Sequence, residues 1–229
     1  MPQEADISKL EAQWHAFFPR RDRDLIAGIW AEMRDKYSEP QRFYHHLGHL
    51  VDLFEYWDRY YAHLHHPRVV GLVLVGHDVL YDIGAQDNEE RSAVYTGERL
   101  ERLGEDSATV SRVMELIRMT AVHACPRDDP DAALMLDMDM AIIGAPPNDY
   151  DRYAQAIEAE YSQIYAPEAF WRGRLSRFID LLLQQPRLFK TDLFENALGP
   201  RARANLTREK QALLDRLRGL EHDVGHPRR

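Results

Sequence analysis

The most hydrophobic stretch of the chain lies at 69–80 and leaves almost no polar face. A helix that is apolar on all sides is a buried helix, so we expect residues 68–82 to form the central helix of the fold. Its second half contains an adjacent histidine and aspartate, His77 and Asp78. Buried carboxylates are costly unless they are paired or bound to a metal ion. The pattern therefore predicts that His77 and Asp78 are two ligands of one metal ion.

Hydrophobic residues recur at helical spacing through most of the remaining chain, and proline and glycine mark the boundaries. We find no internal repeat, low-complexity tract or clear linker, so we expect a single all-α domain over 1–229, with its core at about 40–206. The further predicted helices cover 6–18, 22–37, 41–64, 88–103, 106–123, 131–143, 148–165, 167–184 and 200–220.

Composition supports this fold and excludes some partners. The frequent Leu, Met, Ala, Glu and Arg residues favour helix, and a hydrophobic content of 45% in 229 residues is enough for a core. A net charge of −9 argues against binding to a nucleic-acid polymer, which requires a basic face. It does not exclude a small anionic substrate, because a metal ion can reverse the local charge.

Location is predicted from what the sequence lacks. The single cysteine, Cys125, cannot form an intramolecular disulfide, and nothing indicates an oxidising compartment. The start of the sequence has no signal-peptide pattern, and the longest apolar run is too short to span a bilayer. We therefore expect a soluble cytoplasmic protein that does not bind a membrane. A homodimer stays open as an alternative to a monomer.

Two further residues extend the proposed metal site. His49 lies on the predicted helix 41–64, and Asp139 lies in the apolar stretch 134–143. Two imidazoles and two carboxylates suit a divalent ion such as Mn, Mg, Fe, Co, Ni or Zn, with water completing the shell. Asp137 is about 200° from Asp139 around a helix, so only one of the two can face the site. We take Asp139 as the ligand and keep Asp137 as the alternative.

The motifs around these residues resemble those of HD-domain metal-dependent phosphohydrolases, in which His, His-Asp and Asp follow one another on successive helices. The sequence YHHLGH at 44–49 is similar to the YHxxxH motif of a bacterial branch of predicted HD phosphohydrolases, and HDVLYD and DNEERSA, at 77–82 and 87–93, resemble two further blocks. The resemblance covers about 40–206. Later blocks of the branch are matched at 136–144, 160–161, 173–174 and 202–206.

The resemblance implies an HD-type helical bundle that holds a divalent metal through His49, His77, Asp78 and Asp139. It also implies hydrolysis of a phosphate ester of a small phosphorylated molecule, such as a nucleotide. His45 maps onto the residue that protonates the leaving oxygen in eukaryotic cyclic-nucleotide phosphodiesterases. Those enzymes have asparagine where this chain has His46, so a cyclic-nucleotide substrate is not implied.

A metal site of this kind predicts a simple mechanism. The metal lowers the pKa of a bound water towards ~7, and that water attacks phosphorus. His45, one helical turn from His49, is then the expected acid for the leaving alkoxide. Asp78 is a ligand that could instead bridge two metals or orient the water.

Four other polar residues have a functional and a structural interpretation. Asp82, four residues after Asp78, is expected to position water, or it is a polar helix-terminal residue. Asn88 and Glu89 either line the mouth of the pocket or cap a helix. His123 is either a ligand or a residue favoured by the dipole at a helix end.

Two other functions stay open. Some HD-domain proteins are di-iron oxygenases that use extra histidines, but this chain has only His123 between Asp78 and Asp139. A second iron would therefore be poorly ligated, and we rank this function lower. The other alternative is a non-catalytic metal-binding or sensor domain, which would bind metal without any turnover.

Overall fold

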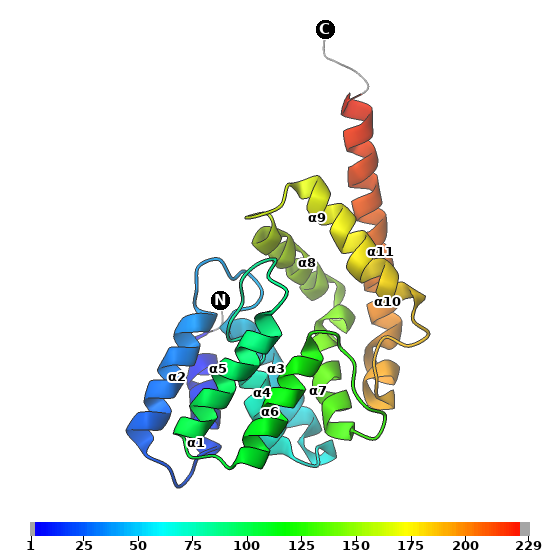
Figure 1. Cartoon of the computed structure of the whole chain (residues 1–229). Helices are drawn as coiled ribbons and strands as arrows, with labels where there is room; N and C mark the ends of the chain where they lie inside the picture. Colours follow the sequence, from blue (N-terminus) through cyan, green and yellow to red (C-terminus); the bar gives the residue numbers. More distant parts are fainter. Residues whose placement is uncertain (1–2, 225–229) are drawn as a thin grey trace. The chain divides into compact units, whose positions relative to one another are not determined.

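The computed structural model describes residues 3–224, and within that range the chain is helical and contains no strand (Figure 1). This confirms the predicted all-α class. The elements are α1 (Glu4–Ala16), α2 (Arg23–Tyr37), α3 (Leu47–Tyr60), η1 (Tyr61–His63), α4 (Pro67–Gly76), α5 (Asn88–Arg102), α6 (Ser107–Thr120), α7 (Pro130–Met140), η2 (Ala141–Gly144), α8 (Pro147–Tyr161), α9 (Pro167–Arg174), η3 (Leu175–Ile179), α10 (Asp180–Gln184) and α11 (Asp192–Val224).

These helices form two compact units that meet in the sequence at the end of α7. The first unit ends at Asp139, and the second begins at Met140. All four candidate metal ligands belong to the first unit. The single domain predicted over 1–229 stays a prediction. Among the described residues, no helix combines the length and the apolarity that a membrane crossing requires.

Helix α4 lies at the centre of the first unit and packs against α3, α5 and α6. Its residues from Val70 to Gly76 are all buried, as its uniformly apolar sequence predicted. A Cβ atom on Gly71 would lie 2.4 Å from Cζ of Phe17, so a side chain at this position would displace the Phe17 ring. The small residue therefore makes room for this ring, which directly follows α1.

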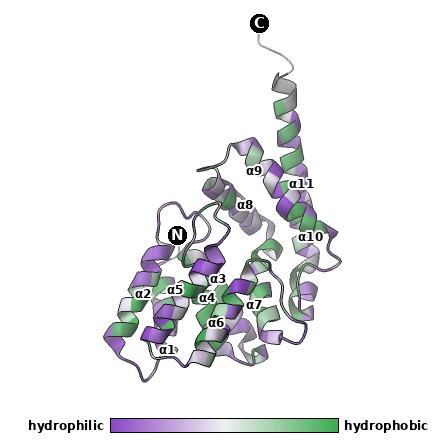
Figure 2. Ribbon diagram, in the orientation of Figure 1, coloured by the Kyte–Doolittle hydropathy of each residue, from purple (hydrophilic) through white to green (hydrophobic). Residues whose placement is uncertain are grey.

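The surface helices of this unit are amphipathic. Figure 2 shows both hydrophilic and hydrophobic residues along α2, whose buried side includes Ile26, Ile29, Trp30 and Met33. These residues recur at the helical spacing from which the helix over 22–37 was predicted. The same side ends in Tyr37, which is 1% exposed and reaches the candidate site described below.

Among the predicted helices that are shorter than expected, two affect the site. The central helix ends at Gly76, not at Asp82, so His77 and Asp78 follow the helix instead of lying within it. The helix expected over 41–64 begins only at Leu47 and gives way to the 3₁₀ turn η1 at Tyr61. His45 therefore lies in a turn and does not share a helical face with His49.

An unusual N-cap explains why α3 begins at Leu47. His46 has an extended backbone, and its Nδ1 accepts a hydrogen bond of 2.8 Å from the backbone N–H of Gly48. A Cβ on Gly48 would lie 2.5 Å from Cε1 of His46, so glycine makes room for the imidazole. The cap separates the turn that carries His45 from the helix that carries His49.

In the second unit, α8 ends at Tyr161 instead of 165, and two other helices also differ from the prediction. Helix α11 begins at Asp192, eight residues before the expected start, and it contains Pro200 in its interior. The helix expected over 167–184 is interrupted by the π-helical segment η3. Inside this unit, Arg174 donates hydrogen bonds to Glu209 and to the Tyr153 hydroxyl, so its buried charge is paired.

Candidate metal centre

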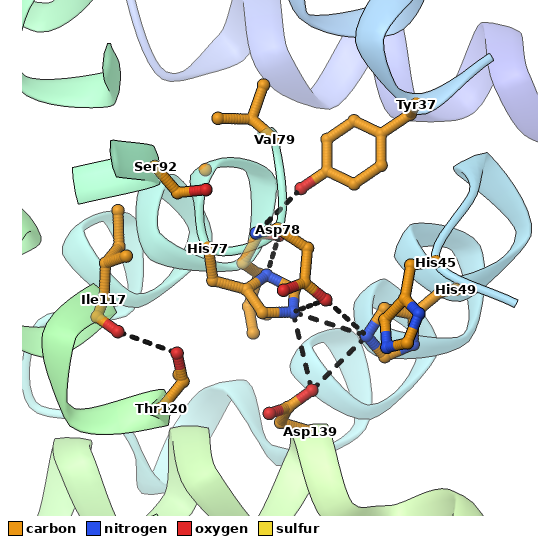
Figure 3. A network of polar contacts seen from close by, with 12 residues as sticks. Tyr37, His45, His49, His77, Asp78, Val79, Ser92, Ile117, Thr120 and Asp139 are labelled. Carbon is orange, nitrogen blue, oxygen red and sulfur yellow. Dashed lines mark hydrogen bonds and ion pairs between the residues drawn. The ribbon is translucent and has the colours of Figure 1, made fainter. Parts of the chain in front are cut away.

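The four residues predicted as metal ligands lie together in the first unit (Figure 3). Oδ1 of Asp139 lies 3.3 Å from Nε2 of His49 and 3.4 Å from Nε2 of His77. The two imidazole Nε2 atoms are 3.3 Å apart. Oδ2 of Asp78 lies 3.2 Å from Nε2 of His77 and 4.0 Å from Nε2 of His49. Four side chains that are far apart in the sequence therefore lie together in space.

Three elements place these side chains. His49 comes from the first turn of α3, and Asp139 comes from the last turn of α7. His77 and Asp78 leave the C-terminal end of α4, which is enclosed by other helices. The side chains are only 3–4% exposed for the histidines and 13% exposed for the aspartates. Nitrogen and oxygen ligands therefore converge in a nearly dry interior.

The arrangement fits a bound cation. In a tetrahedral site with bonds of about 2.1 Å, neighbouring ligand atoms lie about 3.4 Å apart, close to the separations seen here. Nδ1 of His77 lies 3.0 Å from the carbonyl oxygen of Leu74, an arrangement that favours a proton on Nδ1, so the neutral imidazole directs its Nε2 lone pair at the cluster. His49, His77 and Asp139 alone already form a group capable of holding a metal ion.

Charge coupling inside the cluster is strong. Burial alone would lower the pKa of His77, but Asp78 and Asp139 outweigh burial and hold that pKa well above its usual range. Burial alone would raise the pKa of Asp139, yet hydrogen bonds from His123, His49 and His77 hold it well below its usual range. The pKa of Asp78 is lowered in the same way, chiefly by His77. The carboxylates therefore stay ionised and available to a cation at neutral pH.

Side chains from α5 hold the irregular segment 77–82 in place. Ser92 accepts a hydrogen bond from the N–H of Leu80 and donates one to its carbonyl oxygen, at 3.0 and 3.1 Å. Asn88 bonds both backbone groups of Asp82 in the same way, each at 2.9 Å. Because Asn88 and Ser92 are four residues apart, they share one face of α5. This explains Asn88 as a residue that orders the site's backbone, a role that the sequence interpretation missed.

Two more contacts fix the start of this segment. Thr96, one turn beyond Ser92, donates to the carbonyl oxygen of Gly76 at 3.3 Å, and a Cβ on Gly76 would lie 2.5 Å from its Oγ1. The Tyr37 hydroxyl accepts a hydrogen bond from the N–H of Asp78 at 3.3 Å and donates to the carbonyl oxygen of Val75 at 2.9 Å. The backbone of the His-Asp pair is thereby held from both sides.

His45, the predicted acid, lies at the edge of the cluster. Its ring stacks on the ring of Tyr81, with centroids 4.1 Å apart, and its centroid is 6.2 Å from that of His49. Its electrostatic effect contributes to the lowered pKa of Asp78, which places it within reach of the candidate ligands. The structure therefore brings His45 to the site through a turn, although the sequence predicts a helix there.

His123 contacts the cluster through Asp139. Its Nε2 lies 3.0 Å from Oδ2 of Asp139, the oxygen that does not face His49 and His77. The backbone of His123 is left-handed, with φ 47°, a conformation that is uncommon outside glycine. The contact orients the carboxylate, which is a common role for a residue next to a metal ligand.

The remaining candidates, Asp82, Glu89 and Asp137, are not part of the cluster of four candidate ligands. The Asp82 carboxylate is 65% exposed and pairs with Arg91 at 2.6 Å, and Asp78 and Asp82 both follow α4 instead of lying within the helix expected over 68–82. Its role in positioning water stays a prediction, as does the role of Glu89 in the first turn of α5. Asp137 is buried on α7, but it is Asp139 that contacts His49 and His77.

The pKa shifts of His77, Asp78 and Asp139 predict that the stability of the metal-free protein and the stabilisation by bound metal change with pH in opposite directions. The raised pKa of His77 contributes stability that is complete below about 6.5 and is lost as pH rises through the raised value. The lowered carboxylate pKa values contribute stability above about 3.8 that is lost as pH falls through the lowered values.

A metal ion must displace the His77 proton, so we expect binding at neutral pH to release about one proton. The increase in melting temperature on adding metal should grow from pH 5.5 to pH 8.5, while the metal-free melting temperature falls. Thermal unfolding with and without metal, and calorimetry in buffers of different ionisation enthalpy, measure the two effects. A metal-induced shift that is the same at every pH would contradict the proposed competition between metal and proton.

Comparison of the chain with models of known protein families, with curated proteins and with solved structures finds no match in any of the three. Membership of the HD superfamily therefore stays a prediction that rests on the sequence motifs.

Proposed function

We propose that this protein is a metal-dependent phosphohydrolase that cleaves a phosphate ester of a small molecule, such as a nucleotide. The observation that carries the proposal is the buried convergence of His49, His77, Asp78 and Asp139, with ligand atoms at separations suited to one cation. The resemblance of the surrounding motifs to HD-domain phosphohydrolases supports the type of reaction.

Each side chain has a distinct role in this proposal. His49, His77 and Asp139 hold the ion, and Asp78 either completes the set or orients the attacking water. A divalent cation supplies Lewis acidity, which lowers the pKa of a water ligand towards ~7 and offsets charge on the phosphoryl oxygens. His45 gives a proton to the leaving oxygen. His123 holds Oδ2 of Asp139, so that Oδ1 stays directed at the two imidazoles.

The two alternatives predict different observations. A di-iron oxygenase requires ligands for a second iron. The candidate histidine for this second iron is His123, and its Nε2 lies against Oδ2 of Asp139. A sensor domain would bind one ion tightly and turn over no phosphate ester. Counting metal ions per chain, together with measuring oxygen consumption and hydrolysis, separates these alternatives from the proposal.

The proposal is tested by metal analysis and a substrate screen. The metal-free protein is reloaded with Mn²⁺, Mg²⁺, Co²⁺ or Ni²⁺ and offered 4-nitrophenyl phosphate, bis(4-nitrophenyl) phosphate and a panel of nucleotides. We expect hydrolysis with at least one ion, and we expect Asp78→Ala to lose metal and activity together. The matched control is Glu90→Gln, which removes an exposed carboxylate that pairs with Arg118. It should retain both properties.

The possible outcomes distinguish the proposed function from its alternatives. Tight metal binding without hydrolysis of any ester would favour the sensor function and overturn the proposal. Hydrolysis that survives chelation, or that Asp78→Ala leaves at the parent rate, would show that the site described here is not responsible for it.

A further inference from the structure

One buried cation connects the two parts of the chain that meet at the candidate site. The Arg42 side chain has no exposed surface and lies in the turns between α2 and α3. Its Nη1 donates to the carbonyl oxygens of Asp78 and His45, at 2.7 and 3.1 Å. Its Nη2 donates to the carbonyl oxygen of Val79 at 2.9 Å. One guanidinium group therefore joins the backbone of the predicted acid to the backbone of a candidate ligand.

The link spans a gap that helix geometry leaves open. The structure places His45 in a turn before α3 and Asp78 in the irregular segment after α4, so no continuous helix sets the distance between them. Catalysis depends strongly on such distances, because a displacement of about 1 Å can cost about 100-fold in rate. The Arg42 hydrogen bonds set this distance directly.

The surroundings of Arg42 suit a guanidinium and not an ammonium group. The guanidinium carbon lies 5.2 Å from the Tyr37 ring centroid and 5.7 Å from that of Tyr81. Tyr81 in turn stacks on the imidazole of His45. The third nitrogen, Nε, donates to the carboxylate of Glu39 at 3.3 Å. A planar fork can make these contacts together, whereas a lysine ammonium is a single point of charge.

We propose that Arg42 is a positioning residue that holds the leaving-group acid His45 and the metal ligand Asp78 in register through their backbone carbonyls. The inference rests on the proposed function of the site and adds a residue that the sequence interpretation did not single out. Arg42 acts through these two residues and does not itself contact metal or substrate.

The first test compares Arg42→Lys with the parent by titration with Co²⁺, whose visible absorption reports the geometry of its ligands without any need for turnover. We expect about 10- to 100-fold weaker Co²⁺ binding and an altered absorption band, as for other residues that orient metal ligands. The matched control is Arg68→Lys. Arg68 forms a two-pronged ion pair with Glu105 and also bonds the Phe17 carbonyl oxygen. This control should lose stability but keep the parent spectrum.

The second test uses Arg42→Ala and adds guanidinium ion at millimolar concentration. The ion fits the space left by the side chain and should restore part of the lost rate in kcat, while urea at the same concentration should not. A role confined to stability would give no such rescue. If Arg42→Ala does not fold, the Co²⁺ titration of the first test is made with Arg42→Gln, which keeps more of the buried volume and removes the charge.

Failure of this inference differs from failure of the proposed function. A parent protein that takes up no Co²⁺ and hydrolyses no ester overturns both. A parent that binds Co²⁺, with Arg42 variants that match it in spectrum, affinity and rate, overturns the role of Arg42 alone. The same holds if the variants lose only stability and guanidinium rescues nothing.

Discussion

Replacing Asp139 by asparagine is expected to abolish tight metal binding and to lower the rate of hydrolysis by about 10³-fold or more. Oδ1 of Asp139 lies within 3.4 Å of both imidazole Nε2 atoms, so its negative charge is central to the cluster. Asparagine keeps the shape of the side chain but removes the charge. Metal content after dialysis and the rate at saturating metal measure the two losses.

Asp137→Asn is the matched control for this prediction, because it makes the same chemical change two residues away on the same helix. Asp137 is also buried, so a loss caused only by burying an amide on α7 should appear in both variants. We expect Asp137→Asn to keep metal affinity within a few-fold of the parent. Loss of metal in Asp137→Asn with retention in Asp139→Asn would reverse the assignment of the ligand.

The Asp139→Asn variant also checks the origin of the pH dependence. The raised pKa of His77 depends in part on Asp139, so removing that charge should bring the His77 pKa down. The metal-induced increase in melting temperature should vanish at every pH in this variant. A residual increase that still grows with pH would mean that other groups bind the ion.

Three of the four candidate ligands, His77, Asp78 and Asp139, could be predicted from sequence because each lies in an apolar run that makes it conspicuous. An aspartate or histidine inside a run such as 69–80 or 134–143 has no solvent to face, so a partner or an ion must compensate its polarity. His49 lacked this signal, because no uniformly apolar run surrounds it in the sequence. The resemblance to HD-domain motifs supplied it, and the structure now shows the residue 4% exposed.

The ends of the helices around the site could not be predicted in the same way. Hydrophobic periodicity continues through Val79 and Leu80, which favours a helix to 82. The chain leaves the helix at Gly76 because side chains distant in sequence, among them Ser92 and Thr96, bond the backbone groups that a helix would have paired. Local patterns carry no information about such partners until the fold has brought them together.

Replacing His45 by alanine is expected to leave metal binding intact and to lower the rate on substrates with alkoxide leaving groups by about 10²- to 10⁴-fold. The imidazole stacks on Tyr81 beside the ligand cluster, close enough to help lower the pKa of Asp78. An alkoxide is a poor leaving group without a proton. A 4-nitrophenolate is a good one, so the same variant should lose much less rate on bis(4-nitrophenyl) phosphate. The measurement is the ratio of kcat/KM values for the two kinds of ester.

His46→Asn is the control that separates the acid from its neighbour. His46 caps α3 through its Nδ1 and the N–H of Gly48, and asparagine is among the preferred N-cap residues. We therefore expect this variant to fold and to keep the parent's dependence on the leaving group. The substitution also introduces the asparagine that cyclic-nucleotide phosphodiesterases have at this position. If His45→Ala hydrolyses alkyl esters at the parent rate across the pH range, the proton must come from elsewhere. The four candidate metal ligands would then remain the only part of the site with a chemical role.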